Sequence, residues 1–345
     1  MSSSQPSLPD LDVAGGGMQF NVDGWEPEYG QALDMELQLA ESRADVDPDI
    51  EVPQDRWRPI AVDPAVTAPR VVLFVDGVRR VDARVWIDEP IGADGVVPTA
   101  ATAGVCASYA AGVVCCCEGK AHVIAVELCR GMFTIAPHAT DVHTRAGTYQ
   151  ACFTVAKEGT PLPVTLSSAV QERLAGVELR TANRARSSLA GHVEVDDDLL
   201  VVDGPLRAGA HLDRAVGYIK SHHSEYLSRQ LNSVVGSLGP RQRTPVFRMV
   251  TTWDRYSWYL RLPCAPAAPW AGVIRVEASV DLVPEQVFAL ANLTQVVLPR
   301  YASAEYKDAR APQNLYPIGG LEKDLRHKLG DQQLLYRALR QAAAM

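Results

Sequence analysis

Apolar runs that stop at charged residues or glycines dominate the first half of the chain and predict a sheet. The predicted strands, which are separated by Gly, Pro, Asp and His clusters, are 71–75, 80–87, 105–117, 122–135 and 148–155. Runs of this length that are rich in Val, Ile and aromatic residues are typical of strands. The connections between them are short, which predicts an antiparallel meander.

Two of the apolar runs share an ending. Asp76 and Asp203 each follow at least four apolar residues, and each precedes a glycine. Such a run is typical of a fully buried strand, and a carboxylate directly after it stands at the rim of a sheet. Asp-Gly is also a common turn signal, so a turn is the alternative for either motif alone. Two such strands with a helix between them favour a shared site.

The helix between them is predicted from apolar residues that return every three or four positions over 165–190. This stripe consists of Val170, Leu174, Val177, Thr181 and Ala185. Glu178 lies on or beside the stripe and is predicted to point toward the sheet. An ionised carboxylate buried there costs several kcal/mol unless a cation or proton accompanies it, and a divalent metal ion is the simplest solution. In the alternative, Glu178 pairs on the helix surface with Arg180 or Arg184.

The remaining pattern alternates helix and strand. Helices are predicted at 29–43, 217–238, 284–293 and 321–343, and strands at 199–202, 246–251, 256–262 and 272–280. Strands in a run followed by this alternation predict an α/β (α+β) fold, with a mixed sheet and helices packed on its faces. We expect a disordered tail over 1–28, an N-terminal helical extension over 29–66 and the main domain over 67–345.

Composition narrows the function classes. The net charge of −8 argues against non-specific adhesion of the whole surface to nucleic acid, although a local basic groove remains compatible with it. None of the seven cysteines forms a Cys-x-x-Cys pair, so we interpret them as reduced, buried residues of a cytoplasmic protein rather than as a zinc site or disulfide framework. No segment approaches the roughly 20 apolar residues that cross a bilayer, so we expect no membrane contact.

Three carboxylates around hard cations are the arrangement used for phosphodiester hydrolysis, in which metal ions clamp the attacking and leaving oxygens. Further motifs then give a resemblance. In order along the chain they are Phe74-Val-Asp-Gly77, Glu178, Leu200-Val-Val-Asp-Gly-Pro-Leu206, Gly217-Tyr-Ile-Lys-Ser221, Tyr256-Ser-Trp-Tyr-Leu-Arg-Leu262, Ile274-Arg-Val-Glu277 and Gln313-Asn-Leu-Tyr-Pro-Ile318. From about residue 70 to residue 331 the chain resembles NurA-domain nucleases.

That resemblance implies an RNase H-like fold and DNA nuclease activity at ends and on single strands, with two Mn²⁺ (or Mg²⁺) ions as cofactor. It also implies a homodimer and a HerA-type hexameric ATPase as partner. Carried over, Asp76, Glu178 and Asp203 are the metal ligands, and Tyr316 is a catalytic-site hydroxyl. The family has a His eight residues after this Tyr, where the present chain has Asp324. Either Asp324 ligates the metal, or His327 replaces the family residue, or activity is lost.

Basic residues are grouped where a phosphate backbone would need them. Lys220 is predicted to position the scissile strand in the catalytic site. The predicted DNA-binding residues are Arg180, Arg184, Arg207, Arg214, Lys220, Arg248 and Arg261. Any one of these arginines can instead be an ordinary solvated surface residue.

The sequence therefore predicts a metal-dependent DNA nuclease that processes DNA ends together with a HerA-type ATPase. The alternative is a catalytically impaired NurA-like subunit that binds DNA or the ATPase as an assembly partner, which the missing His and the acidic overall charge favour. A glycosidase that uses paired carboxylates is a weaker alternative, because the chain lacks an aromatic-rich sugar platform.

Overall fold

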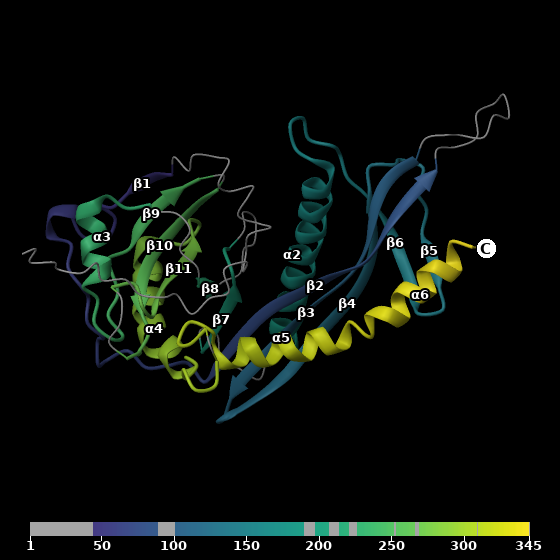
Figure 1. Ribbon diagram of the computed structural model, residues 1–345. Coiled ribbons are helices and arrows are strands. Elements are labelled where there is room, and N and C mark those ends of the chain that lie inside the picture. The colour runs from purple at the N-terminus through teal and green to yellow at the C-terminus, as the bar shows by residue number, and fades with distance from the viewer. Residues whose placement is uncertain are drawn as a thin grey trace, which may run out of the picture.

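The computed structural model describes residues 44–88, 101–189, 197–206, 214–220, 226–251, 253–265, 269–308 and 310–344. The predicted tail and the predicted helix over 29–43 lie outside the described residues. Figure 1 shows a long twisted sheet with helices on both faces and the C-terminus at one end.

The described strands form one sheet in the order β1-β9-β10-β11-β8-β7-β2-β3-β4-β6-β5. Their bounds are β1 Asp45–Asp47, β2 Val71–Asp88, β3 Ala101–Cys117, β4 Lys120–Thr134, β5 Val142–Thr144, β6 Gly147–Phe153, β7 Asp198–Asp203, β8 Ala215–Ile219, β9 Phe247–Val250, β10 Asp254–Arg261 and β11 Val273–Ser279. Most of these strands match runs predicted from alternation and composition. The sheet is larger than the predicted meander because the C-terminal strands join its other edge.

The centre of the sheet has the predicted RNase H-like topology. Strands β2, β3 and β4 form an antiparallel meander. The later strand β7 pairs with the opposite edge of β2 and runs parallel to it, and β8 runs parallel to β7. The order β4-β3-β2-β7-β8 therefore brings the two apolar Asp-Gly strands side by side in the middle of the sheet.

Strand β2 differs from the prediction. The sequence predicted a break at Asp76-Gly77, but β2 is one strand of 18 residues that passes through this pair. It is hydrogen-bonded to β3 along its whole length, with a register shift only between Val81 and Ala83. A turn at Asp76 would leave the long partner strand β3 unpaired there, and pairing across the sheet overrides the local turn signal.

The helices cover both faces of the sheet (Figure 1). Their bounds are α2 Leu162–Leu189, α3 Arg229–Gly236, α4 Pro284–Val297, α5 Tyr316–Lys328 and α6 Gln332–Ala342, with short 3₁₀ turns η1 Gln54–Arg56 and η2 Leu298–Arg300. Helix α2 packs on the face that carries Leu73 and Val75, whereas α4 and α5 pack on the face that carries Val72 and Phe74. The predicted inward stripe of α2 is buried, which confirms its helical period.

Three further predictions were wrong in detail. Residues 217–219 belong to strand β8 rather than to a helix, because β7 and β11 pair with both of its edges. The predicted helix 321–343 is two helices, and Gly330 between them adopts a φ of 85°, which ends the first one. Strand β6 joins β4 in parallel instead of extending the antiparallel meander.

The segment 44–66 is part of the same sheet rather than a separate helical extension. Strand β1 pairs antiparallel with β9, and in the described part of this segment the helical residues are those of η1. The guanidinium of Arg243, which is 1% exposed, donates to Glu51 at 2.7 Å. A buried charge of this kind must be paired, so Glu51 fastens the segment to the sheet.

Two further observations concern the described helices and the cysteines. Among the described helices, none combines the length and the hydropathy required to cross a bilayer. All seven cysteines are free thiols. Burial raises the pKa of the Cys106 thiol to about 12, as expected for a thiol used as a small apolar side chain.

Candidate functional site: a carboxylate group at the β2–β7 junction

Asp76 and Asp203 lie next to each other on adjacent parallel strands. Val75 of β2 is in register with Val202 of β7, so the two aspartates follow at neighbouring positions about 5 Å apart across the sheet. Side chains alternate along a strand, so both carboxylates point to the face that carries Phe74 and Val201. Asp203 ends β7, as the sequence predicted, whereas Asp76 is held inside β2.

Glu178 lies beside the next residue of β2, on the face of the sheet that helix α2 covers. A methyl group added at Gly77 would fall on Oε1 of Glu178 and would lie 2.7 Å from Cδ1 of Leu174. The absence of a side chain at Gly77 therefore leaves the space that the Glu178 carboxylate occupies, from which its charge acts on Asp76. Arg180 and Arg184, the partners named in the alternative, both bind Glu127 of β4, at 2.9 and 2.8 Å.

Lys220 follows β8 and is the cation of the group. Its Nζ donates to Oδ2 of Asp203 at 2.7 Å, and the two side chains are 8% and 13% exposed. The other oxygen of this carboxylate, Oδ1, is buried and accepts no hydrogen bond from the described residues. A buried carboxylate oxygen without a donor carries a desolvation cost that a bound cation would remove.

Negative charge is crowded at this point. Burial raises the pKa of Asp76 well above its ordinary value, and the charge of Asp203 raises it further. Lys220 opposes this shift, and Glu178 adds to it. Like-charged carboxylates that share a desolvated site take up a proton or a cation, so Asp76, Asp203 and Glu178 together can hold a hard divalent ion.

Tyr316 is not brought into this group. It lies at the start of α5 and lines a cavity of about 490 Å³ with Arg70, Cys117 and Arg300. Arg70 precedes Asp76 by six residues, which is about 20 Å along an extended strand. The hydroxyl of Tyr316 accepts a hydrogen bond from the backbone N–H of Ala304 at 3.1 Å.

The two candidates for the family His lie further along α5. Asp324 pairs with Lys328 on its own helix at 3.7 Å, and its side chain is 42% exposed. His327 is exposed in the last turn of the helix. The charged groups that act most strongly on Asp76 are Asp203, Lys220 and Glu178, so neither α5 residue belongs to the group as described.

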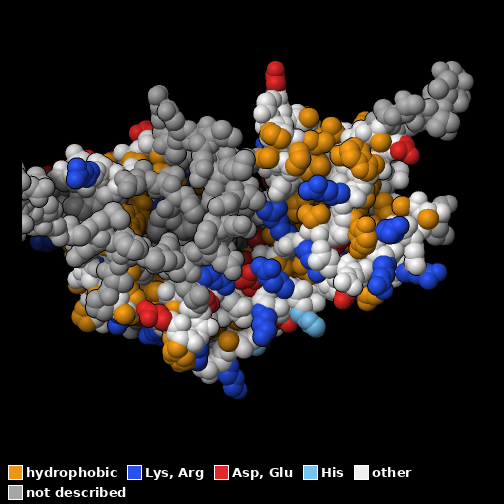
Figure 2. All heavy atoms as spheres, in the orientation of Figure 1, with side chains coloured by type: hydrophobic (Ala, Val, Ile, Leu, Met, Phe, Trp, Pro, Cys, Tyr) orange, Lys and Arg blue, Asp and Glu red, His pale blue; other side chains and the backbone are white. Residues whose placement is uncertain are grey.

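The predicted DNA-binding arginines have different surroundings. Arg180 and Arg184 are about 60% exposed on α2 and share Glu127. Arg214 donates to the backbone oxygen of Asp198, at the end of β7 opposite to Asp203. Arg207 lies outside the described residues. Figure 2 shows Lys and Arg side chains spread over the region of α2, α5 and α6 on this face, with a few acidic side chains among them.

Two arginines on the C-terminal strands are structural in this fold. Arg261 is buried. Its guanidinium donates to three backbone oxygens, those of Gly236, Pro269 and Ala271. It therefore holds the chain around β10 and is not available to DNA, which corrects the prediction for this residue. Arg248 pairs with Asp254 across the β9–β10 hairpin.

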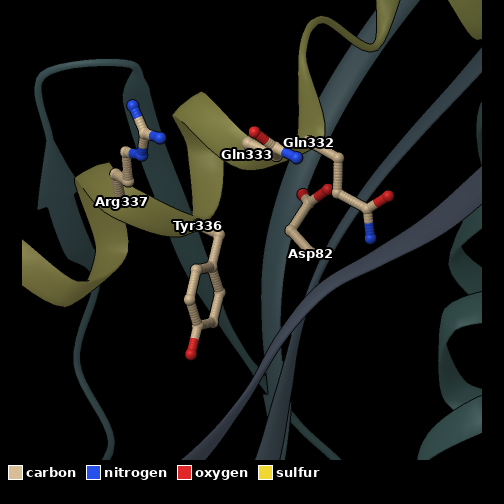
Figure 3. A pocket seen from close by; sticks show the side chains of 5 residues that line it. All are labelled: Asp82, Gln332, Gln333, Tyr336 and Arg337. Carbon is tan, nitrogen blue, oxygen red and sulfur yellow. The ribbon is translucent and has the colours of Figure 1, made fainter.

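A second buried carboxylate escaped the sequence analysis. Asp82 accepts hydrogen bonds from Ser108, Tyr149 and Arg80. It borders a cavity of about 470 Å³ between β2 and α6, with Gln332, Gln333, Tyr336 and Arg337 on the other wall (Figure 3). Three donors satisfy this carboxylate, so it serves the packing of the strands rather than a metal site.

Comparisons with known proteins give remote structural likenesses. No family model and no curated protein matches the sequence. The crystal structure of the NurA nuclease from Sulfolobus solfataricus is 12% identical over 91% of this chain and 95% of that chain, with a TM-score of 0.43. An endonuclease V from Bacillus subtilis is 12% identical over 80% of this chain and 87% of that chain, with a TM-score of 0.31. Both TM-scores are low, so function is inferred from the site itself.

Proposed function

We propose that this chain is a divalent-metal-dependent DNA nuclease. The observation that supports the proposal is that Asp76, Asp203 and Lys220 meet at one buried stretch of the sheet, with the Glu178 carboxylate near enough to raise the pKa of Asp76. Carboxylate oxygens suit Mg²⁺ and Mn²⁺, and the buried Oδ1 of Asp203 without a donor fits a cation ligand. A bound ion of this class supplies an activated water and neutralises charge on a scissile phosphate.

The residues of the chain have separate tasks in this proposal. Asp76 and Asp203 are fixed by the sheet, so they bind the cation in a preset geometry with little reorganisation. Glu178 completes the ligand set from α2. Lys220 neutralises Asp203 in the metal-free protein and is placed to contact a phosphate oxygen of the substrate, which orients the strand to be cut.

DNA as substrate, action on ends and single strands, manganese as the preferred ion, the homodimer and the HerA-type partner are the finer part of the proposal. They follow from the NurA-like order of motifs, not from the site geometry. The exposed arginines of α2 are compatible with a phosphate backbone nearby.

A non-catalytic assembly role is the second candidate. The observation in its favour is that Asp324, which stands where the NurA family has a His, pairs with Lys328 instead of joining the carboxylates. In this case the chain binds DNA or the ATPase without cutting, and manganese has no effect on its melting temperature.

The test is cleavage of labelled linear and single-stranded DNA with Mn²⁺, Mg²⁺ or chelator, with and without a HerA-type ATPase. We expect Asp76→Asn and Asp203→Asn to lose at least about 100-fold in rate. Asp198→Asn is the matched control, because Asp198 lies on the same strand as Asp203 but pairs with Arg186 at the other end. Equal cleavage by all four proteins would reject the proposal, and metal-insensitive binding without cleavage would select the assembly role.

A further inference from the structure

Three side chains with soft donor atoms meet near the turn of the β3–β4 hairpin, away from the carboxylate group. They are Cys115, Cys117 and His122, and one ligand atom from each lies within 4.8 Å of the other two. Cys115 is buried, Cys117 is half-buried and His122 is exposed, so the cluster opens from the protein interior to solvent.

Strand geometry builds this cluster. Cys115 and Cys117 are two residues apart on β3, so they point to the same face of the sheet. Cys115 is directly opposite His122 on β4. Side chains at directly opposite positions of an antiparallel pair lie on one face about 5 Å apart, which places the imidazole beside both thiols.

A β-bulge sets this register. Val113 is opposite Ala125, but Val114 is opposite Val123, so Ile124 is an extra residue on β4. Without the extra residue, His122 would be opposite Cys116 and would point to the other face. A bulge re-aims the side chains that follow it, and here it turns the imidazole toward the two thiols.

The cluster is separate from the carboxylate group. Cys115 packs with Leu73 and Val75 on the α2 face, whereas Asp76 and Asp203 point to the α4 and α5 face. Cys115 is also opposite Leu73, three residues before Asp76, which is about 10 Å along the strand.

We propose that Cys115, Cys117 and His122 bind one zinc ion. Two thiolates and an imidazole are the donors that zinc prefers, whereas Mn²⁺ and Mg²⁺ prefer oxygen. Ligand atoms about 2.0–2.3 Å from a tetrahedral ion lie roughly 3.5–4 Å apart, so small side-chain rotations close the observed spacing. Binding releases the two thiol protons to solvent, and the exposed side of the cluster leaves the fourth position to water.

The site would tie the two strands of the hairpin together near its turn. Because zinc binds the folded chain and not the unfolded one, the stability that it adds grows with the logarithm of its concentration over its Kd. This inference does not depend on the proposed nuclease function, since none of the carboxylates takes part.

The test uses the full chain, stripped with chelator and titrated with Co²⁺ alone as a spectroscopic substitute for zinc. We expect a thiolate-to-cobalt absorption band with one ion per chain, and its loss in Cys115→Ala and Cys117→Ala. His122→Ala changes an exposed residue and preserves the fold. It should weaken Co²⁺ binding at least about tenfold, because mutation of even the hydrogen-bond partners of metal ligands typically lowers metal affinity 10- to 100-fold. Added Zn²⁺ should displace the cobalt and raise the melting temperature.

Two controls sharpen the result. Cys116→Ala removes the thiol between the two ligands, which points to the opposite face, and should retain the band. The double variant Asp76→Asn, Asp203→Asn should also retain it, which separates this site from the carboxylate group. A wild-type protein without the band, a band that survives in His122→Ala at unchanged affinity, or its loss in a folded Cys116→Ala variant would overturn the inference.

Discussion

Asp76-Gly77 and Asp203-Gly204 present neighbouring carboxylates from one sheet, yet their glycines do different work. Gly77 lies inside β2, and its missing side chain gives space to Glu178. Gly204 follows the end of β7 with a φ of 106°, and no atom of the described residues lies within 4 Å of where its Cβ would be. One glycine serves the approach of a functional side chain, and the other serves the backbone turn. The same dipeptide therefore contributes to the site in two separable ways.

The largest effect that separates the two glycines is expected on cleavage. Gly77→Ala puts a methyl group onto the Glu178 carboxylate and against Leu174. A displacement of about 1 Å in a catalytic group costs on the order of 100-fold in rate. Gly204→Ala meets no atom of the part of the chain that the structure describes, and it should keep the rate within about threefold of wild type, which is the scale of a small geometric shift. Rates are compared at saturating Mn²⁺.

A double variant identifies the cause of the Gly77→Ala effect. If the methyl group acts by displacing Glu178, then Gly77→Ala combined with Glu178→Gln should be little slower than Glu178→Gln alone. Fully additive losses would mean that Gly77 acts independently of Glu178 and would break the proposed difference between the two glycines.

Both variants are expected to lose a similar amount of stability, for different physical reasons. Gly204→Ala forces a side chain into a left-handed backbone conformation, which costs about 1–3 kcal/mol of unfolding free energy. Gly77→Ala costs a similar amount, about 1–3 kcal/mol, through overpacking against α2. Urea unfolding of the two variants gives the comparison. A loss of cleavage in Gly204→Ala as large as that in Gly77→Ala, at equal stability, would contradict the assignment.

The crowding of charge at Asp76 predicts a pH-dependent effect of intermediate size. Burial and Asp203 raise the pKa of Asp76 above its ordinary value of 3.8. At a pH above 3.8 the metal-free native state therefore binds more protons than the unfolded state. Stability of the metal-free protein should therefore fall as pH rises through the window between the ordinary and the raised pKa. Asp76→Asn removes this penalty and should be more stable than wild type by about 1 kcal/mol at neutral pH.

The measurement is the melting temperature of the wild type and of Asp76→Asn in chelator, from about pH 3.5 to neutral. This range begins roughly at the ordinary carboxyl pKa. The advantage of Asp76→Asn should be absent at the acidic end and grow with pH. A wild-type protein that gains on the variant as pH rises would show that the native site favours the charged carboxylate.

The smallest effect is expected at Tyr316. Its hydroxyl accepts one backbone hydrogen bond and lies away from the carboxylates, so Tyr316→Phe should change cleavage less than about threefold and stability by about 1 kcal/mol. Cleavage assays with single-stranded DNA provide the check. A loss comparable to that of Asp203→Asn would mean that α5 moves toward the strands when DNA binds.

Local periodicity predicted much of this architecture. The period of α2 places Glu178 beside the buried stripe, and the apolar run before Asp203 predicts a strand that ends there. Both signals are carried by residues that are close in sequence. The RNase H-like topology came from the resemblance of ordered motifs, and the described strand order confirms it.

Features set by pairing between distant segments could not be predicted. Strand β2 continues past Asp76 because β3 holds it, and β8 is a strand because β7 and β11 flank it. The Cys115 and His122 pair depends on a bulge at Ile124, and no spacing in the sequence records that register. The burial of Arg261 likewise depends on backbone oxygens of neighbouring loops.

The most direct test of the carboxylate group is a crystal structure of the chain with Mn²⁺, with anomalous data collected at the manganese absorption edge. The proposed function predicts an anomalous peak between the carboxylates of Asp76 and Asp203 and its loss in Asp203→Asn. Well-ordered crystals with saturating Mn²⁺ and no peak at this position would contradict it.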